Sequence, residues 1–255
     1  MEIINILWTG GWDSTYRVME LLLTENKAVR PFYIVDPERL SLADEIQAMD
    51  KIRKKIQAKY PLIAENLLPL EVVHIDTIPK DDEITGWFRQ IASKTRIGPQ
   101  YEWLARFAKY YSSELELCVE TTPAPYTSQL ALMYIQPSLR RLGEGHRCHV
   151  DGPYMEPGVE LFKYFRFPIR HMTKSDMRIS AERSGFIDIM KLTWFCLEPV
   201  QGLPCGQCRP CLLAPLTGIT FRYYQPTVLY KVRKIVGRNL ARAEKFTGRI
   251  AGRSK

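Results

Sequence analysis

The chain has 255 residues, a formal net charge of +8 and a hydrophobic content of 45%. This length and apolar content suffice for one large α/β core with a small appendage, without two independent domains. No stretch reaches the roughly 18 apolar residues of a membrane span, and the N-terminus lacks the layout of a signal peptide. We therefore expect a cytoplasmic protein with no membrane partner.

The positive charge is concentrated in the last residues of the chain. Residues 222–255 contain ten Lys or Arg residues against one acid, Glu244, a local charge of +9. Subtracting this from +8 leaves residues 1–221 at −1. One or two helices are predicted within 223–246. A solvated charged surface is the default interpretation, and a surface that binds nucleic acid or an acidic protein is the alternative.

A turn with two glycines lies between a predicted strand and a predicted helix near the N-terminus. The apolar run 3–7 predicts a buried strand, and the apolar spacing over 12–24 predicts a helix. Gly10 and Gly11 allow the backbone to approach a ligand closely, and a helix start adds N–H groups. Such a turn binds phosphate. The alternative is an ordinary strand-to-helix turn capped by Asp or Ser.

The string T-G-G-W-D-S-T of residues 9–15 resembles the S-G-G-x-D-S motif of the ATP pyrophosphatases, the PP-loop enzymes. Thr9 stands in place of the first Ser and retains a hydroxyl. The resemblance implies ATP with Mg²⁺, and transfer of the α-phosphate to a substrate oxygen before a nitrogen or sulfur nucleophile attacks. It assigns catalysis to Asp13 and Ser14. It assigns ATP binding to Thr9, Gly10, Gly11, Asp13, Ser14 and Thr15.

Strands and helices then alternate along the first half of the chain. Strands are predicted over 29–35, 70–75 and 115–120, and helices over 41–59, 100–111 and 127–142. This rhythm predicts a Rossmann-like, doubly wound parallel sheet. The segment 79–96 is polar and is expected to be irregular. The aromatic residues of 100–111 are expected in the core, with base stacking as the alternative.

A loop, a strand and a capped helix are predicted, in this order, over residues 146–183. His146, Cys148 and His149 lie in a segment, 146–158, that is expected to be a surface loop; a metal site or a substrate-facing loop is the alternative. The alternation over 161–169 predicts a strand. A helix is predicted from Thr173 through residue 183.

Four cysteines form a C-x8-C-x2-C-x2-C pattern, which is typical of a tetrahedral zinc site. Its members are Cys196, Cys205, Cys208 and Cys211. Core cysteines or an iron–sulfur cluster are the alternatives, because four-cysteine sites serve both metals. Cys118 and Cys148 lie outside the group and are expected to pack as ordinary thiols.

The segments 173–186, 193–196 (T-W-F-C) and 204–211 (P-C-G-Q-C-R-P-C) resemble the C-terminal part of the 7-cyano-7-deazaguanine synthases. That family joins a PP-loop to such a zinc site in this order. The resemblance implies ATP-dependent conversion of 7-carboxy-7-deazaguanine and ammonia into an amide and then a nitrile. It implies structural zinc on the four cysteines and a homodimer. It also assigns Lys174 to catalysis, next to the developing phosphate charge; an exposed lysine at a helix start is the alternative.

Two departures from that family concern the substrate. Residues 98–101 stand where those synthases carry an Arg-Asn pair, and their Tyr-Pro-Asp-Cys-Arg stretch has no counterpart. The alternative function is therefore a relative that modifies a macromolecule, or attaches a deazapurine to a protein or nucleic acid, in a modification or antiviral defence pathway. A non-catalytic binding module is a third hypothesis. The expected division is a nucleotide-binding domain over 1–190, a zinc segment over 191–221 and a basic tail over 222–255.

Overall fold

A mixed α/β sheet forms the centre of the molecule. The computed structural model describes residues 1–111, 114–121, 136–141, 148–217 and 219. Within these ranges the sheet has seven strands in the order β3-β2-β1-β4-β7-β6-β5. The first five of these are parallel, whereas β6 is antiparallel to both neighbours. The strands are β1 (Ile3–Leu7), β2 (Ala28–Val35), β3 (Glu71–His74), β4 (Leu115–Glu116), β5 (Leu139–Arg141), β6 (Cys148–Val150) and β7 (Phe165–Phe167).

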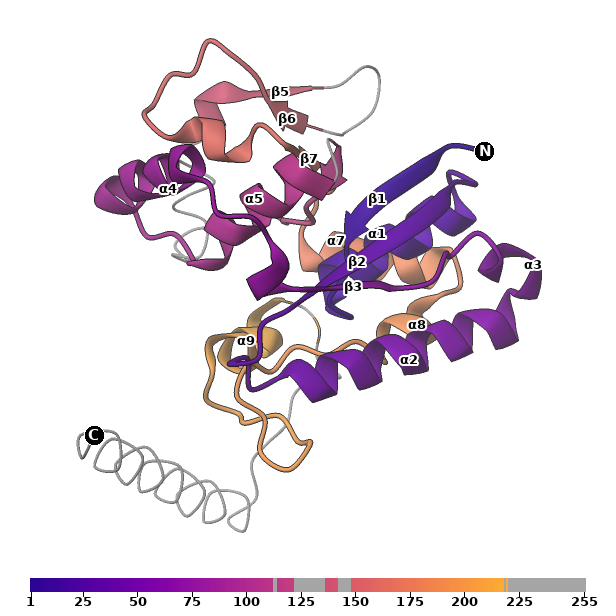
Figure 1. Ribbon diagram of the computed structural model, residues 1–255. Helices are drawn as coiled ribbons and strands as arrows, with labels where there is room; N and C mark the ends of the chain where they lie inside the picture. Colours follow the sequence, from indigo (N-terminus) through magenta and orange to yellow (C-terminus); the bar gives the residue numbers. More distant parts are fainter. Residues whose placement is uncertain (112–113, 122–135, 142–147, 218, 220–255) are drawn as a thin grey trace.

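Helices cover both faces of the parallel part of the sheet (Figure 1). One face carries α1 (Trp12–Leu23), α2 (Leu42–Lys59), α3 (Pro61–Ala64), α7 (Lys174–Arg183) and α8 (Ile187–Met190). The other carries α4 (Asp82–Lys94), α5 (Gln100–Tyr111) and the 3-10 helix η4 (Val159–Phe162). Shorter elements are η1 (Ile75–Thr77), η3 (Gln136–Ser138), α9 (Arg209–Leu213) and η5 (Ala214–Thr217).

Strand residues alternate between two apolar clusters, one for each face. In β1, Ile6 packs toward α1 and α2, and Leu7 packs toward α4 and α5. In β2, Tyr33 and Phe32 make the same alternation. Both faces are buried, which explains why these strands read as continuous apolar runs. Pro31 is tolerated in β2 because pairing with β3 begins only at Phe32.

A buried ion pair fixes α1 against β4. Nε and Nη2 of Arg17 each donate to the carboxylate of Glu116 over 2.8 Å, and both side chains are 3% exposed. Arg17 Nη1 also donates to Glu20 over 2.7 Å and to Glu25. Burial opposes the charge of Arg17, but its hydrogen bonds with Glu116 and the attraction of that carboxylate raise the arginine's pKa. The pair therefore holds the middle of α1 beside the end of β4.

The segment 79–96, expected to be irregular, contains the helix α4. Its start is capped by Asp81, whose carboxylate accepts a hydrogen bond from the N–H of Ile84 over 3.0 Å. Ile84 and Ile91 are fully buried and lie two helical turns apart. The expectation was wrong because the polar residues between them conceal a short apolar stripe with helical spacing.

Several other expectations need correction. The helix predicted over 41–59 is α2, in which Glu45 is buried and Ile46 is 42% exposed, because Glu45 accepts hydrogen bonds from β2 and the loop before α2. The predicted helix 127–142 is wrong over 136–141, which forms η3 and β5; the remainder lies outside the described residues. Within the predicted loop 146–158, residues 148–150 are β6. The predicted strand 161–169 is a strand only over 165–167, after η4.

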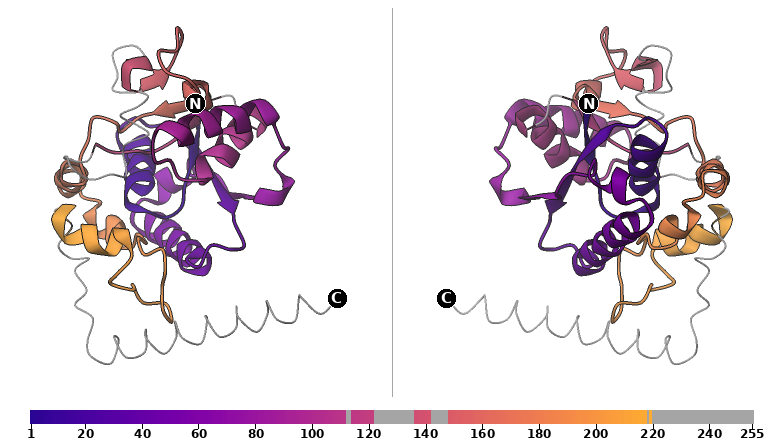
Figure 2. Two further views of the ribbon diagram at one scale, coloured as in Figure 1. Left: turned by 90° about the vertical axis from the view of Figure 1, so that its left-hand side faces the viewer. Right: turned by 90° about the vertical axis from the view of Figure 1, so that its right-hand side faces the viewer.

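The remaining predicted elements agree with the structure to within a few residues, although β4 is shorter than expected. The helix over 173–183 has the expected Thr173 cap, reinforced by Asp176 in a capping box. Residues 191–217, orange in Figure 2, lie next to α2. The basic tail and its predicted helices lie outside the described residues. Within the described ranges, none of the helices combines the length and apolarity that crossing a membrane requires.

Candidate functional site

The glycine turn, residues 9–15, lies where the strand order of the sheet reverses. β1 and β4 are neighbours, and the glycine turn follows the carboxyl end of β1 and includes the first residues of α1. In open α/β sheets, ligands bind at this switch point. Gly10 has a φ of +66°, and a Cβ there would lie 2.9 Å from Met49 Cγ and 3.2 Å from the Glu45 carbonyl oxygen. Only glycine fits this position, so α2 packs directly against the turn.

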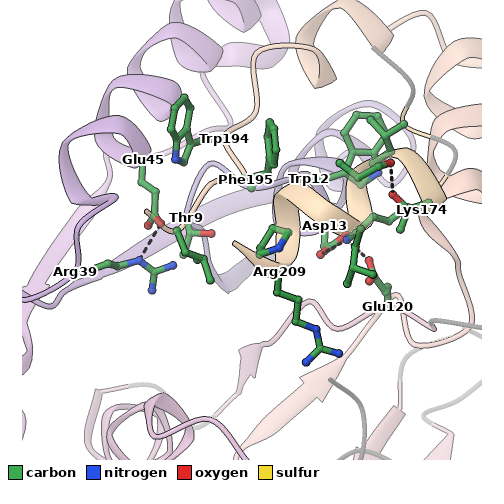
Figure 3. A pocket seen from close by; sticks show the side chains of 17 residues that line it. Thr9, Trp12, Asp13, Arg39, Glu45, Glu120, Lys174, Trp194, Phe195 and Arg209 are labelled. Atoms are coloured by element: carbon green, nitrogen blue, oxygen red, sulfur yellow. Dashed lines mark hydrogen bonds and ion pairs between the residues drawn. The ribbon is translucent and has the colours of Figure 1, made fainter. Parts of the chain in front are cut away.

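A cavity of about 300 Å³ opens above the turn (Figure 3). Its wall combines Thr9, Gly11 and Asp13 of the turn with Lys174 of α7 and Trp194 from the segment after α8. α1 has 12 residues, and its first N–H groups have no partner within the helix. An anion in this cavity would therefore meet a helix N-terminus, a lysine and hydroxyl-bearing turn residues.

Lys174 joins two carboxylates at the centre of this wall. Its Nζ lies 2.6 Å from Oδ1 and 2.9 Å from Oδ2 of Asp13, and it also donates to Glu120 just beyond β4. The three side chains are 20%, 28% and 15% exposed, respectively. Figure 3 shows the three polar ends directed toward one another at the cavity wall. Lys174 is therefore not a surface lysine that merely begins a helix.

The triad contains two carboxylates and one ammonium group, so the two carboxylates share one cation. Burial and the neighbouring Asp13 raise the pKa of Glu120 to about 8, although Lys174 opposes this increase. Burial alone would lower the pKa of Lys174, but the attraction of Asp13 and Glu120 outweighs it and raises that pKa. Lys174 thus stays protonated near neutral pH, and Glu120 titrates in that range.

An arginine lies on the other side of Thr9 from this triad (Figure 3). Arg39 Nε donates to Glu45 over 2.8 Å, and Glu45 also accepts hydrogen bonds from Tyr33 over 2.9 Å and Ser41 over 2.7 Å. Across the part of the chain that the structure describes, no group accepts a hydrogen bond from either Nη atom of Arg39. A guanidinium held by one edge presents its other edge to a carboxylate or phosphate.

A second cavity of about 220 Å³ shares Thr9, Gly11, Asp13 and Arg39 with the first. It lies between the ends of β1, β2 and β4 and the helix α5, where Gln100 is the first helical residue. Its other walls are mainly apolar, with Phe32, Ile34, Trp103, Leu104 and Leu117 among them. Trp103 therefore faces a cavity as well as the core. The two cavities can hold two ligand parts that meet over the glycine turn.

The structure brings together four of the six residues predicted to bind ATP. Thr9, Gly11, Asp13 and Ser14 line one or both cavities. Thr15 does not: its hydroxyl accepts a hydrogen bond from Trp8 Nε1 over 3.0 Å and is fully buried in the core. Gly10 lines neither cavity, and its contribution is the positive φ that the turn requires.

The four predicted metal-binding cysteines lie together. Their sulfur atoms are all within 4.8 Å of one another. Cys208 Sγ is 3.8 Å from Cys196 Sγ and 3.4 Å from Cys211 Sγ. Tetrahedral zinc with bonds of about 2.3 Å places sulfur atoms about 3.8 Å apart. The geometry fits one tetrahedral ion, whereas the thiolates of an iron–sulfur cluster bind different irons and need wider spacing.

Backbone N–H groups support the sulfur atoms of this cluster. The N–H of Cys205 lies 3.1 Å from Cys196 Sγ, and the N–H of Cys208 lies 3.1 Å from Cys205 Sγ. Such donors stabilise thiolate charge around a bound metal. The cysteine cluster can therefore hold a metal ion such as zinc.

The cysteine segment is connected directly to the glycine turn. The N–H of Trp194 donates to the carbonyl of Gly10 over 2.9 Å, and Trp194 Nε1 donates to the carbonyl of Cys196 over 2.7 Å. Trp194 therefore links the first cysteine to the turn that shapes both cavities. The metal cluster and the candidate anion site form one structural unit.

Three polar residues of the site were not among the predicted site residues. Glu120 ends the predicted strand 115–120. An acid at the carboxyl end of a parallel strand is a signal from which it could have been predicted. Arg39 follows the strand β2 in the same way. Glu45 occupies an otherwise apolar stripe of α2, with Met49 and Ile52. A charge at such a position indicates a buried polar network.

The two sequence comparisons do not assign this chain to a family. No protein-family model matches it, and the search of curated proteins found no significant match.

Proposed function

We propose that the protein is an ATP-dependent C–N ligase of the 7-cyano-7-deazaguanine synthase type. It activates a carboxylate, 7-carboxy-7-deazaguanine or a relative, as an acyl adenylate and releases pyrophosphate. Ammonia then attacks the activated carbon, giving an amide and AMP, and a second activation converts the amide to a nitrile. The four cysteines hold structural zinc.

One observation carries this proposal: two motifs that are far apart in the sequence meet at one cavity. Lys174 bonds to Asp13 across 161 positions, and Trp194 bonds to the backbone of Gly10. The motif resemblance alone requires neither contact. Their meeting supports a single site in which the glycine turn and the lysine act on the same phosphate group.

The residues of this site have distinct roles in the proposed reaction. The first N–H groups of α1, with Thr9 and Ser14, bind the phosphates of ATP. Lys174 stabilises the negative charge that develops at the α-phosphate. Asp13 would be the carboxylate that holds Mg²⁺ beside the phosphates of ATP, where the ion would neutralise phosphate charge. Arg39 binds either the carboxylate of the substrate or the α-phosphate of ATP to which that carboxylate becomes joined.

The test is mass spectrometry of a reaction with ATP, Mg²⁺, ammonium and 7-carboxy-7-deazaguanine. The proposal expects AMP together with the amide or the nitrile. Asp13→Asn should abolish the reaction while the protein remains folded. If the acid stays unchanged and no AMP forms, the proposed substrate is wrong.

A second candidate function is the attachment of a deazapurine to, or the modification of, a protein or nucleic acid. The charge of +9 in residues 222–255 favours it, because such a surface binds polyanions. Deleting residues after Tyr224 should then leave ATP turnover intact and weaken the binding of nucleic acid or an acidic protein. Unchanged binding of RNA, DNA and candidate protein partners would count against this function.

A further inference from the structure

Glu120 is a largely buried carboxylate of the first cavity to which the proposed reaction has so far given no role. It lies four residues beyond Glu116, the last residue of β4, at the switch point of the sheet. Its side chain is 15% exposed and lines the cavity that contains Asp13 and Lys174. A ligand bound over the glycine turn is therefore within reach of this carboxylate.

Glu120 shares the ammonium of Lys174 with Asp13. Lys174 makes two contacts with Asp13, at 2.6 and 2.9 Å, and must also serve Glu120. Arg170, after β7, donates through Nη1 to the backbone carbonyl of Glu120 over 3.1 Å and to the Thr121 hydroxyl over 2.8 Å. One ammonium between two carboxylates thus leaves one proton to be gained or lost at this position.

We propose that Glu120 is the proton acceptor for the nitrogen nucleophile in the second half of the reaction. This inference rests on the proposed function. The nucleophile enters the cavity as an amine or ammonia and attacks the carbonyl carbon of the acyl adenylate. Glu120 takes the proton that the nitrogen loses as its bond to carbon forms.

The step balances without any further reactant. The new C–N bond forms with the nitrogen lone pair, and the C–O bond to the phosphate breaks. AMP leaves with that electron pair, and the proton passes from nitrogen to the Glu120 carboxylate. Glu120 returns the proton to solvent through the open side of the cavity before the next cycle.

The acid–base properties of Glu120 suit this role better than those of its neighbours. A general base is most effective when its pKa lies near the working pH. Burial and Asp13 raise the pKa of Glu120 to about 8, whereas Lys174 is held in its protonated form. Both carboxylate oxygens of Asp13 contact Lys174, and in the proposed reaction Asp13 serves the activation of the acid.

The test separates the two half-reactions. Exchange of labelled pyrophosphate into ATP, with 7-carboxy-7-deazaguanine and no ammonium, reports activation alone. Amide formation with added ammonium reports both halves. In Glu120→Gln we expect exchange to stay within about threefold of wild type and amide formation to fall about 10²- to 10⁴-fold. At a fixed concentration of free ammonia, the wild-type rate of amide formation should rise with pH through an apparent pKa near 8, and the variant should lack this limb.

Hydroxylamine and a second variant make the assignment specific. Hydroxylamine is a stronger nucleophile than ammonia, and once added to the carbonyl carbon its more acidic nitrogen passes its proton readily to water. The Glu120→Gln variant should therefore lose much less of its rate of hydroxamate formation than of its rate of amide formation. Glu114→Gln is the matched control, since Glu114 pairs with Arg166 at the surface and its side chain is 68% exposed. It should leave both half-reactions unchanged.

The failures of the two proposals are distinguishable. If wild-type protein shows no exchange, the proposed function fails and this inference falls with it. If wild-type protein shows exchange and Glu120→Gln loses exchange and amide formation equally, Glu120 serves activation, and only this inference is overturned. Full amide formation by Glu120→Gln also overturns it.

Discussion

Lys174 and Asp13 are 161 positions apart in the sequence, yet Lys174 Nζ contacts both carboxylate oxygens of Asp13, at 2.6 and 2.9 Å. The lysine begins α7, and the aspartate lies in the first turn of α1. Their contact brings a cation to a helix N-terminus that already favours anions. The two ends of the candidate site are connected through this pair.

Replacing Lys174 with Met should lower the rate of ATP-dependent AMP formation about 10²- to 10³-fold, the usual effect of removing one preorganised charge at a reacting centre. The variant leaves Asp13 and Glu120 without their shared cation. Lys51→Met is the control, because Lys51 is exposed on α2 and donates to Gln47 at the surface over 2.9 Å. Steady-state kinetics of AMP release measure the difference. Equal rates for both variants would exclude Lys174 from the reaction.

Gly10→Ala should destabilise the protein by about 1–3 kcal/mol and disturb both cavities. The residue has a positive φ, and the added Cβ would press on Met49 of α2. Gly86→Ala is a control of the opposite sign: nothing lies within 4 Å of its Cβ position in α4. That change should stabilise the protein by up to about 1 kcal/mol. Urea denaturation measures both, and a neutral Gly10 variant would contradict the packing described above.

The purified protein should contain one metal ion per chain, and we expect zinc. Cys208→Ser should remove it and lower the unfolding temperature markedly, because a structural site contributes folding energy directly. Cys148→Ser, in β6, should retain the metal. Elemental analysis and thermal unfolding measure the two effects. Iron with visible absorption would instead indicate an iron–sulfur centre.

Breaking the buried ion pair between α1 and β4 should be costly. Arg17→Met leaves Glu116 buried with a charge and without its bidentate partner, and we expect a loss of about 3–5 kcal/mol. The surface pair Lys54–Asp50 is the comparison, with side chains 76% and 55% exposed. Lys54→Met should change stability by less than about 1 kcal/mol. Similar urea midpoints for the two variants would show that burial of the first pair has no energetic consequence.

The stability of wild-type protein should fall relative to Glu120→Gln as the pH rises from 4 toward 9. Burial and Asp13 raise the pKa of Glu120 to about 8, so between its ordinary pKa and 8 only the unfolded chain releases this proton. A pKa that is higher by one in the folded chain corresponds to about 1.4 kcal/mol, and we expect a relative loss of at least that size by pH 9. Thermal unfolding over this pH range measures it. Parallel curves would contradict the raised pKa.

Elements with a strong period and short motifs could be predicted from the sequence. The strand 3–7 and the helix α2 were predicted correctly because burial imposes a period on apolar residues, although the charged Glu45 takes one buried position of α2. The cysteine pattern predicted a metal cluster because short spacing on a turn leaves few arrangements for the sulfur atoms. α4 was missed because its apolar positions are few and widely spaced.

Which charged groups share a cavity depends on how distant parts of the chain pack together. Glu120, Lys174 and Asp13 come from three elements, and no local pattern predicts that β4 lies beside β1 and brings them together. The same holds for Trp194, whose N–H meets the carbonyl of Gly10 only because the chain returns across α2. Local propensity acts over a few residues, whereas strand order and burial set the distances between charges, and those distances determine the pKa values on which the chemistry depends.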